Sequence, residues 1–586
     1  MSAPEAPHSA ARRRAATLLA APIVLLLLWT VVWPNVAVVG GSFGEGLGHW
    51  RAFWASPADR EALWTTLWIS AASVVASTLV GAPLALLLAR AEFAGRRLVA
   101  AVATLPAALP PLVGVLAFLF LYGESGIVTR VVQRALGLGE APWRLSGPWA
   151  IVFVHAYTMY VYVYLFVQAG LARLDPSLDE AARGLGLPAW RRLVRVTLPL
   201  LGPALAGSSL LVFMSSLGSF SAPYVFGGGL RVLSTQIVVS RLNGDTGMAY
   251  VETTVLALSA VAAVLLLRWL ERRRPPVTGA GKGARAARRP VSRGPARTLV
   301  ALAAALTVLV LVLPHLVILL IAFAKDGAWT TQLLPPTYTL GNVRRVLTEP
   351  GLWGPVRNSV AMGLVSTAAA VAVCALGAYL VVLRRFPGRR LLQLLLTLPW
   401  AIPATAIAIG LASTFDRNDP ASLRALLVGT WWILPLAYFV RGVPLVASAV
   451  EGSLRQMDPT IEDAARGLGA SWPRTMWRVI LPAARPGLVA GATLAMITAV
   501  GEFVASVVLY THHNRPMSME ILAQIRQLSF GGAAAYSALL LGIVLLVTLF
   551  ARLVGEEGTP ARAAERTADG VAPRGTLPAA STAPVG

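Results

Sequence analysis

Long, almost uncharged apolar runs recur along this chain of 586 residues and constrain its fold more than any other feature. About 20 apolar residues in a helix cross the ~30 Å hydrocarbon layer of a bilayer, because each helical residue adds about 1.5 Å. Only 13% of the residues are charged and the mean hydropathy is +0.67, so charged side chains are too few to cover a soluble protein of this length. The sequence therefore predicts an all-α membrane protein.

We count twelve such runs, which fall into two sets of six. In the first half of the chain the runs cover residues 17–40, 63–89, 98–122, 148–170, 203–226 and 250–270. In the second half they cover residues 298–323, 357–383, 392–413, 427–449, 486–510 and 534–551. The first run is too long for the apolar core of a secretory signal, so we expect it to remain as a span. The predicted architecture is about twelve transmembrane helices in two six-helix halves.

The distribution of basic residues indicates how these spans are oriented. Most of the 50 Lys and Arg residues fall in segments that would share a side of the membrane with the N-terminus. Positively charged loops stay in the cytoplasm, so both termini are predicted to be cytoplasmic in a multi-pass protein of the inner membrane. The formal net charge of +23 follows from this topology. Nucleic-acid binding would need a basic stripe with interleaved aromatics, which we do not find, so no nucleic-acid partner is expected.

The segments outside the runs set the remaining domain boundaries. Residues 1–16 are predicted to be a cytoplasmic N-terminus, residues 17–270 the first transmembrane domain and residues 298–554 the second. Residues 271–297 are rich in Arg, Gly, Pro and Ala and predict a flexible, basic cytoplasmic linker. Residues 555–586 have a composition that cannot build a core and predict a disordered C-terminal tail.

An internal repeat relates the two halves. The string Thr-Leu-Pro at Thr104 recurs at Thr397, and the string that begins Glu180-Ala-Ala-Arg-Gly recurs as Asp463-Ala-Ala-Arg-Gly. Because each half has six spans, both halves would cross the membrane in the same sense and be related by an axis along the membrane normal. Such a pseudo-dimer places a transport pathway between its halves.

Two predicted cytoplasmic loops carry the most informative motif. Asp175 and Asp458 are candidate helix N-caps, each followed by proline and an acidic first turn that suits the helix dipole. A Gly-Leu-Gly string then ends the short helix and permits a sharp bend. Leu-Pro follows each bend, at Pro199 and Pro482, before the chain enters the next span. Each half would thus project a short, bent helix pair that can transmit force from a cytoplasmic partner.

These loops resemble the EAA motif of bacterial ABC importer permeases, in which Glu-Ala-Ala, three residues and Gly precede a hydrophobic stretch that ends in Leu-Pro. The second copy departs from the motif because Asp replaces Glu, which leaves open whether both halves couple equally. The resemblance implies the type I ABC importer permease fold, with coupling helices that dock on an ATPase. The implied ATPase-coupling residues are Glu180, Ala181, Ala182, Gly186, Asp463, Ala464, Ala465 and Gly469.

A single chain with two six-span halves is similar to the ferric-iron and thiamine permeases, as are the strings 217–223 and 501–503. The resemblance implies a translocation pathway that works by alternating access, with iron(III) favoured over thiamine, polyamines, phosphonates and other anions. It also implies three partners: a cytoplasmic ABC ATPase in two copies, an extracytoplasmic substrate-binding protein and membrane lipid. The string 279–283 lacks the spacing and the Ser or Thr of a phosphate-binding loop, so we expect no ATPase site and no cofactor in this chain.

Glu502 and its repeat counterpart Ser219 are candidate pathway residues. A carboxylate in an apolar span is costly enough to suggest a function, although an ion pair with an arginine that serves packing is the alternative. His155, also in an apolar span, is predicted to hydrogen-bond between helices, and no metal site is proposed. Two other functional classes stay open. An ion-coupled secondary transporter would need several intramembrane charges, and a membrane enzyme would need a nucleophile with a base.

Overall fold

The computed structural model describes residues 7–272, 289–290, 295–327, 332–416, 422–458 and 460–556, without the side chains of 7–12, 271–272, 289–290, 295–296 and 556. The predicted linker, with the string 279–283, lies mostly outside these residues, and so does the predicted tail. Within them the backbone is almost entirely helical, as lipid requires, because only a helix or a closed barrel satisfies every backbone hydrogen bond internally.

The elements of the first half mostly follow the predicted runs, except that the third candidate span is Pro111–Ala135 rather than the predicted 98–122. They are α1 (Pro7–Leu27), the π-helical turn η1 (Leu28–Val32), α2 (Trp33–Gly41), α3 (Gly48–Ala55), α4 (Pro57–Arg90), β1 (Ala91–Glu92), α5 (Arg96–Val102), the 3-10 helix η2 (Leu105–Ala108), α6 (Pro111–Tyr122), α7 (Ile127–Ala135), α8 (Gly147–Leu171), α9 (Pro176–Gly184), α10 (Ala189–Arg192), the π-helical η3 (Leu193–Thr197), α11 (Leu198–Leu200), α12 (Gly202–Leu217), α13 (Ser221–Phe226), α14 (Leu233–Leu242) and α15 (Thr246–Arg272).

The second half repeats this order. Its elements are β2 (Arg289–Pro290), α16 (Pro295–Ala322), α17 (Gly341–Thr348), α18 (Pro350–Leu383), α19 (Arg389–Thr397), the 3-10 helix η4 (Leu398–Trp400), α20 (Ala404–Phe415), α21 (Ile433–Leu454), α22 (Thr460–Gly467), α23 (Trp472–Thr475), the π-helical η6 (Met476–Ile480), α24 (Leu481–Val500), α25 (Val504–Leu509), α26 (Met517–Arg526) and α27 (Phe530–Glu556). β1 and β2 pair in parallel over two residues each.

The number of spans agrees with the sequence. In the described part of the chain, ten helices are long and apolar enough to cross a bilayer, and two bent helix pairs raise the number to twelve. The predicted class, an all-α membrane protein of about twelve spans, is therefore confirmed.

Two kinds of span depart from a single straight helix. In the third span of the second half, the segments Arg389–Trp400 and Ala404–Phe415 meet at 108°, because Pro403 lacks an amide hydrogen and fixes its own φ. The predicted fifth spans, 203–226 and 486–510, are each interrupted: α12 ends at Leu217 and α24 ends at Val500, and a short helix follows each break.

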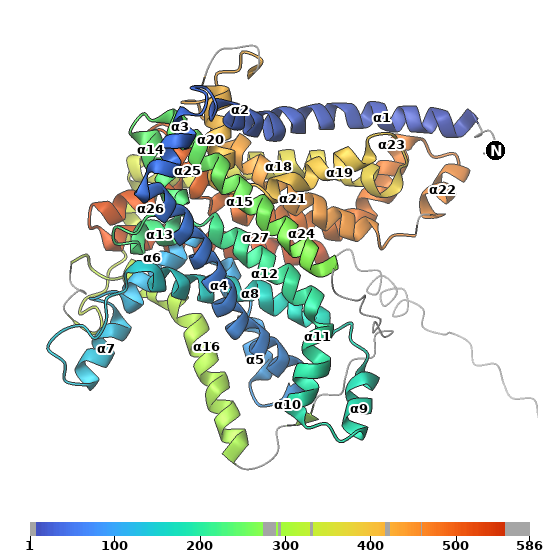
Figure 1. The fold of residues 1–586 in the computed structure, drawn as a ribbon. Coiled ribbons are helices and arrows are strands. Elements are labelled where there is room, and N and C mark those ends of the chain that lie inside the picture. The colour runs from blue at the N-terminus through green and yellow to red at the C-terminus, as the bar shows by residue number, and fades with distance from the viewer. Residues whose placement is uncertain are drawn as a thin grey trace, which may run out of the picture.

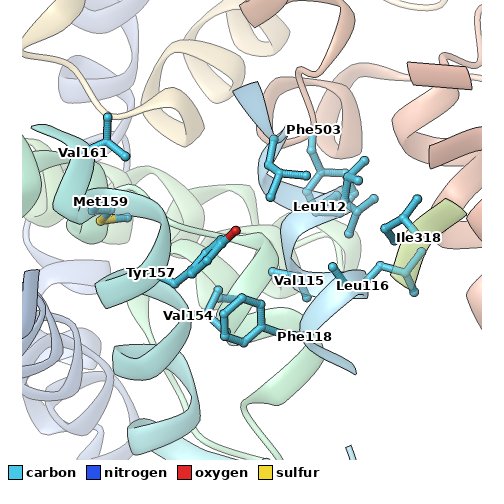
Figure 2. Close-up of a cluster of buried hydrophobic side chains, with 14 of the residues drawn as sticks. Leu112, Val115, Leu116, Phe118, Val154, Tyr157, Met159, Val161, Ile318 and Phe503 are labelled. Atoms are coloured by element: carbon cyan, nitrogen blue, oxygen red, sulfur yellow. The ribbon is translucent and has the colours of Figure 1, made fainter. Parts of the chain in front are cut away.

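The first span of each half contacts the other half. α1 contributes to a hydrophobic core formed mostly by α18, α20 and α21, whereas α16 packs with α6 and α5 of the first half as well as with α27 of its own. Figure 1 shows α1 beside α18 and α19, far from the α8 and α12 of its own half. In Figure 2, Leu116 of α6 lies near Ile318 of α16, and Leu112 lies near Phe503. The halves are thus interlocked around a common centre.

Close helix approach should make Gly81 sensitive to substitution. A Cβ at Gly81 in α4 would lie 2.5 Å from the Tyr160 carbonyl oxygen and 2.9 Å from Val163 Cβ of α8. We expect Gly81→Ala to lower the free energy of unfolding by about 1–3 kcal/mol, since a backbone atom cannot give way. Gly542→Ala in α27 is the control, because nothing lies within 4 Å of its Cβ position. Thermal unfolding in detergent measures both, and equal effects would contradict this packing.

Candidate coupling loops and pathway

The first repeated loop, residues 175–199, forms the predicted bent helix pair. The Ser177 amide donates to Asp175 Oδ1 at 2.9 Å, so Asp175 caps α9. Hydrogen bonds from the Ser177 backbone and side chain lower the pKa of Asp175. The cap is therefore complete at neutral pH and is lost as the pH falls through that lowered value. Gly186 has a φ of +75°, which a residue with a side chain rarely adopts, and it turns the chain from α9 toward α10.

The second repeated loop, residues 458–482, has the same construction. The Thr460 amide donates to Asp458 Oδ1 at 2.9 Å, and this bond, with one from the Thr460 hydroxyl, lowers the pKa of Asp458. Gly469 has a φ of +81° and ends α22 as Gly186 ends α9. Pro459, the predicted first helical residue, lies outside the described residues. Both loops project at one end of the bundle, where α9 and α22 stand well apart (Figure 1).

Each loop presents a leucine at its tip that the EAA motif does not include. Leu185 is 82% exposed and Leu468 is 91% exposed, each directly before the bend glycine. Of the predicted coupling residues, Glu180, Ala181, Asp463 and Ala464 are exposed with them, whereas Ala182 is buried and Ala465 half-buried against its own loop. The leucine that directly precedes the bend glycine in both copies of the repeat was the sequence signal for these residues.

The second loop is attached to the bundle by a group that we call the Glu462 cluster: Glu462, Arg384, Arg466, Tyr379 and Trp472. The buried Glu462 carboxylate accepts from Arg384 and pairs with Arg466 at 3.1 Å. It also accepts from the Tyr379 hydroxyl at 3.2 Å, and the Trp472 indole donates to that hydroxyl at 3.1 Å. This cluster connects α22 to the end of α18.

The first loop is attached to the bundle farther from α9, where Arg90 at the end of α4 donates to the Thr197 hydroxyl at 2.5 Å. Asp179, the repeat counterpart of Glu462, pairs with Arg192 of the same loop at 3.2 Å, and its side chain is 36% exposed. Leu86 and Ala91 stand where the second half has Tyr379 and Arg384. The two loops therefore have the same shape but are attached differently, since a buried carboxylate connects α22 directly to α18, whereas Asp179 of α9 pairs within its own loop.

Glu502 lies at the break between α24 and α25 and is fully partnered. Its Oε2 pairs with Arg441 Nε of α21 at 2.9 Å, and its Oε1 accepts from the Ala505 amide at 3.0 Å. This geometry agrees with the alternative that Glu502 pairs with an arginine. Arg441 was missed at the sequence level, although an arginine inside the apolar run 427–449 was the signal for it.

Ser219 occupies the equivalent break between α12 and α13 but has neutral partners. Its hydroxyl lies 2.9 Å from His155 Nε2, and His155 Nδ1 lies 3.0 Å from the Ser73 hydroxyl and 3.1 Å from that of Ser216. The predicted interhelical hydrogen bonding of His155 is confirmed. The two breaks therefore differ chemically, with hydroxyl and imidazole groups in one half and an ion pair in the other.

The two breaks also bring the halves together. The rings of Phe220 and Phe503 lie 5.6 Å apart between centroids. A Cβ at Gly501 would lie 2.8 Å from Pro110 Cβ of the first half, and one at Gly218 would lie 3.8 Å from Pro403 Cβ of the second. Ser219 and Glu502 thus stand beside the central junction between the halves.

At the end of the bundle opposite the repeated loops, a polar pocket of about 340 Å³ lies between the halves. Arg241 and Asp416, which come from different halves, form an ion pair at 3.5 Å in its wall, and Glu45 pairs with His49 at 3.2 Å. Nowhere among the described residues do three His, Cys, Asp or Glu side chains gather closely enough to hold a metal ion.

Comparison with known proteins gives a consistent family assignment. The family model described as "binding-protein-dependent transport system inner membrane component" matches twice, over residues 81–274 and 372–556. The probable ABC transporter permease protein y4fN of Sinorhizobium fredii is 28% identical over 505 residues, which cover 86% of this chain and 89% of that protein.

Two further relatives are named for different cargoes. The ferric transport system permease protein FbpB of Actinobacillus pleuropneumoniae is 26% identical over 79% of this chain and 66% of its own length. The molybdenum transport system permease protein ModB of Mycobacterium bovis is 31% identical over 37% of this chain and 82% of its own length.

Proposed function

This chain belongs to the family of binding-protein-dependent transport system inner membrane components, and from that premise we propose that its fused halves form the whole translocation pathway of an ABC importer. The pathway opens alternately to the two sides of the membrane as the halves move about their central junction. The observation that carries this proposal is the repeated bent loop with an exposed leucine at its tip, present once in each half.

In this proposal the repeated loops face the cytoplasm, as do both termini, in the inner membrane. Each loop docks on one copy of an ABC ATPase, which gives two ATPase copies per chain. The docking residues are the exposed members of the motif together with Leu185 and Leu468. The polar pocket at the opposite end lies where an extracytoplasmic binding protein would deliver its cargo.

Iron(III) is the cargo that we favour. The ferric permease FbpB aligns with 79% of this chain, which supports this choice over thiamine and polyamines. Molybdenum and sulfate permeases align with shorter parts of the chain, so oxyanion import is the second candidate. Ion-coupled secondary transport is the alternative class.

Reconstitution into proteoliposomes tests this function. The chain is incorporated with its candidate ATPase, and a binding protein loaded with iron(III), molybdate or sulfate is added outside. We expect uptake of one cargo that requires both ATP and the binding protein. Uptake that proceeds without ATP and follows an imposed proton or sodium gradient would contradict the proposal and favour a secondary transporter.

A further inference from the structure

We propose that Arg441 contacts the cargo in the pathway and that the cargo passes it as an anion. This inference rests on the proposed function and narrows its substrate class. The shared chemistry is a negatively charged oxygen group, carried either by a free oxyanion or by iron(III) enclosed in an excess of anionic ligands.

The position of Arg441 places it on the surface between the halves. Accessible residues follow one face of α21 at helical spacing: Arg441, Leu445 and Ser448. The repeat counterparts on α8 are likewise accessible: Thr158, Tyr162 and Leu165. Glu502, the partner of Arg441, stands at the central junction, since the next residue, Phe503, packs on Phe220 of the first half with 5.6 Å between ring centroids. An arginine inside an apolar run is tolerated where it faces the protein interior and pairs with a carboxylate, as Arg441 does with Glu502.

The two members of the ion pair differ in how many of their hydrogen-bonding groups are occupied: both oxygens of Glu502 have partners, whereas one nitrogen of Arg441 has none. Glu502 is 4% exposed, and its two oxygens are taken by Arg441 and by the Ala505 amide. The Arg441 side chain is 28% exposed, and its Nη1, which is buried in this conformation, has no hydrogen-bond partner among the described residues. A cargo that reaches Nη1 when the halves move apart therefore meets an unpaired guanidinium donor rather than a free carboxylate.

The surroundings strengthen this preference for an anion. In the first half the equivalent groups are the hydroxyls of Thr158 and Ser219 with the buried His155, none of which is a carboxylate. Guanidinium binds carboxylate, phosphate and similar oxygen groups through two parallel N–H donors, with charge-assisted bonds about twice as strong as neutral ones. A cation would instead have to displace Arg441 from the buried Glu502 carboxylate, which also accepts a hydrogen bond from the Ala505 amide.

A direct binding measurement tests the inference independently of transport. The full chain in detergent is titrated with sulfate, molybdate or ferric citrate, and the change in Tm is followed. We expect at least one anion to raise the Tm, with Arg441→Gln weakening its apparent affinity by about ten- to hundredfold and Arg441→Lys by less. Sulfate and molybdate report the free oxyanion, and ferric citrate against citrate alone reports the metal complex.

The double variant Arg441→Gln/Glu502→Gln separates cargo contact from packing. If Arg441 serves only to neutralise Glu502, the double variant recovers anion binding, and the inference is overturned. If Arg441 contacts the anion, the double variant stays as weak as the single one. Arg455→Gln is the matched control, since Arg455 also pairs with a glutamate of α21, at 3.1 Å, and should leave binding unchanged.

The same variants in the uptake assay complete the test. Native anion binding without ATP-driven uptake would contradict the proposed function but leave this inference standing. A native chain that none of the three anions stabilises, or that imports thiamine or a polyamine equally well with Arg441→Gln, would overturn the inference.

Discussion

The double variant Leu185→Glu/Leu468→Glu should lose about 100-fold or more of the stimulated ATP hydrolysis that drives transport. Each leucine is exposed at the tip of its loop, and burying one against a partner stabilises a complex by about 1.5–3 kcal/mol. Removing both leucines therefore weakens docking by at least about 3 kcal/mol, and a carboxylate placed in an apolar groove adds its own desolvation cost. The rate of ATP hydrolysis stimulated by the loaded binding protein measures this loss.

The control for this experiment is Leu242→Glu, a leucine that is 78% exposed at the opposite end of the bundle. We expect this variant to retain its association with the ATPase. The single variants Leu185→Glu and Leu468→Glu should each give an intermediate loss. If the double variant hydrolyses ATP at the native stimulated rate, the leucines do not contact the ATPase.

The second large effect is expected from removing the charge of Glu462, which should loosen the repeated loop of the second half and leave that of the first half unchanged. Glu462→Gln removes the carboxylate that pairs with Arg384 and Arg466. Hydrogen bonds to charged groups contribute about 1.5–3 kcal/mol each to stability. The opening of residues 460–475 should become about ten- to hundredfold more frequent, because α22 loses its attachment to α18. Amide hydrogen exchange on the intact chain measures this opening segment by segment.

Asp179→Asn in the first loop is the matched control. Its ion pair with Arg192 is partly exposed, and such pairs contribute up to about 1 kcal/mol. Exchange in residues 176–192 should therefore change little. Equal acceleration in both loops, or in neither, would show that the Glu462 cluster does not hold the second loop more firmly than the first is held.

The spans could be predicted because hydrocarbon thickness and backbone hydrogen bonding leave few solutions for long apolar runs. The bent loops could be predicted because their signals are local: an aspartate cap, a first-turn proline and a glycine at the bend. The interruptions after Leu217 and Val500 were not predicted, since hydropathy continues through both breaks. The contacts that α1 and α16 make with the opposite half depend on tertiary packing that no local pattern records.

The partners of the site were harder to predict than its position. Glu502 was identified from its charge in an apolar run, but its partner Arg441 lies on another helix, and the repeat offers no counterpart, because Thr158 is neutral. Glu462 was overlooked because the motif draws attention to Asp463, its exposed neighbour. Burial distinguishes the two residues, and burial depends on Tyr379 and Arg384, which are remote in sequence.

Site-directed cross-linking tests the central claim, that the repeated loops dock on an ATPase, most directly. Cys374 is the chain's single cysteine and is buried, so an introduced cysteine reacts without background. Leu185→Cys and Leu468→Cys, each treated with a short heterobifunctional reagent in the assembled complex, are predicted to give a permease–ATPase adduct, whereas Leu242→Cys gives none. A complex in which neither loop cysteine forms the adduct, or in which Leu242→Cys forms it equally well, would contradict the account.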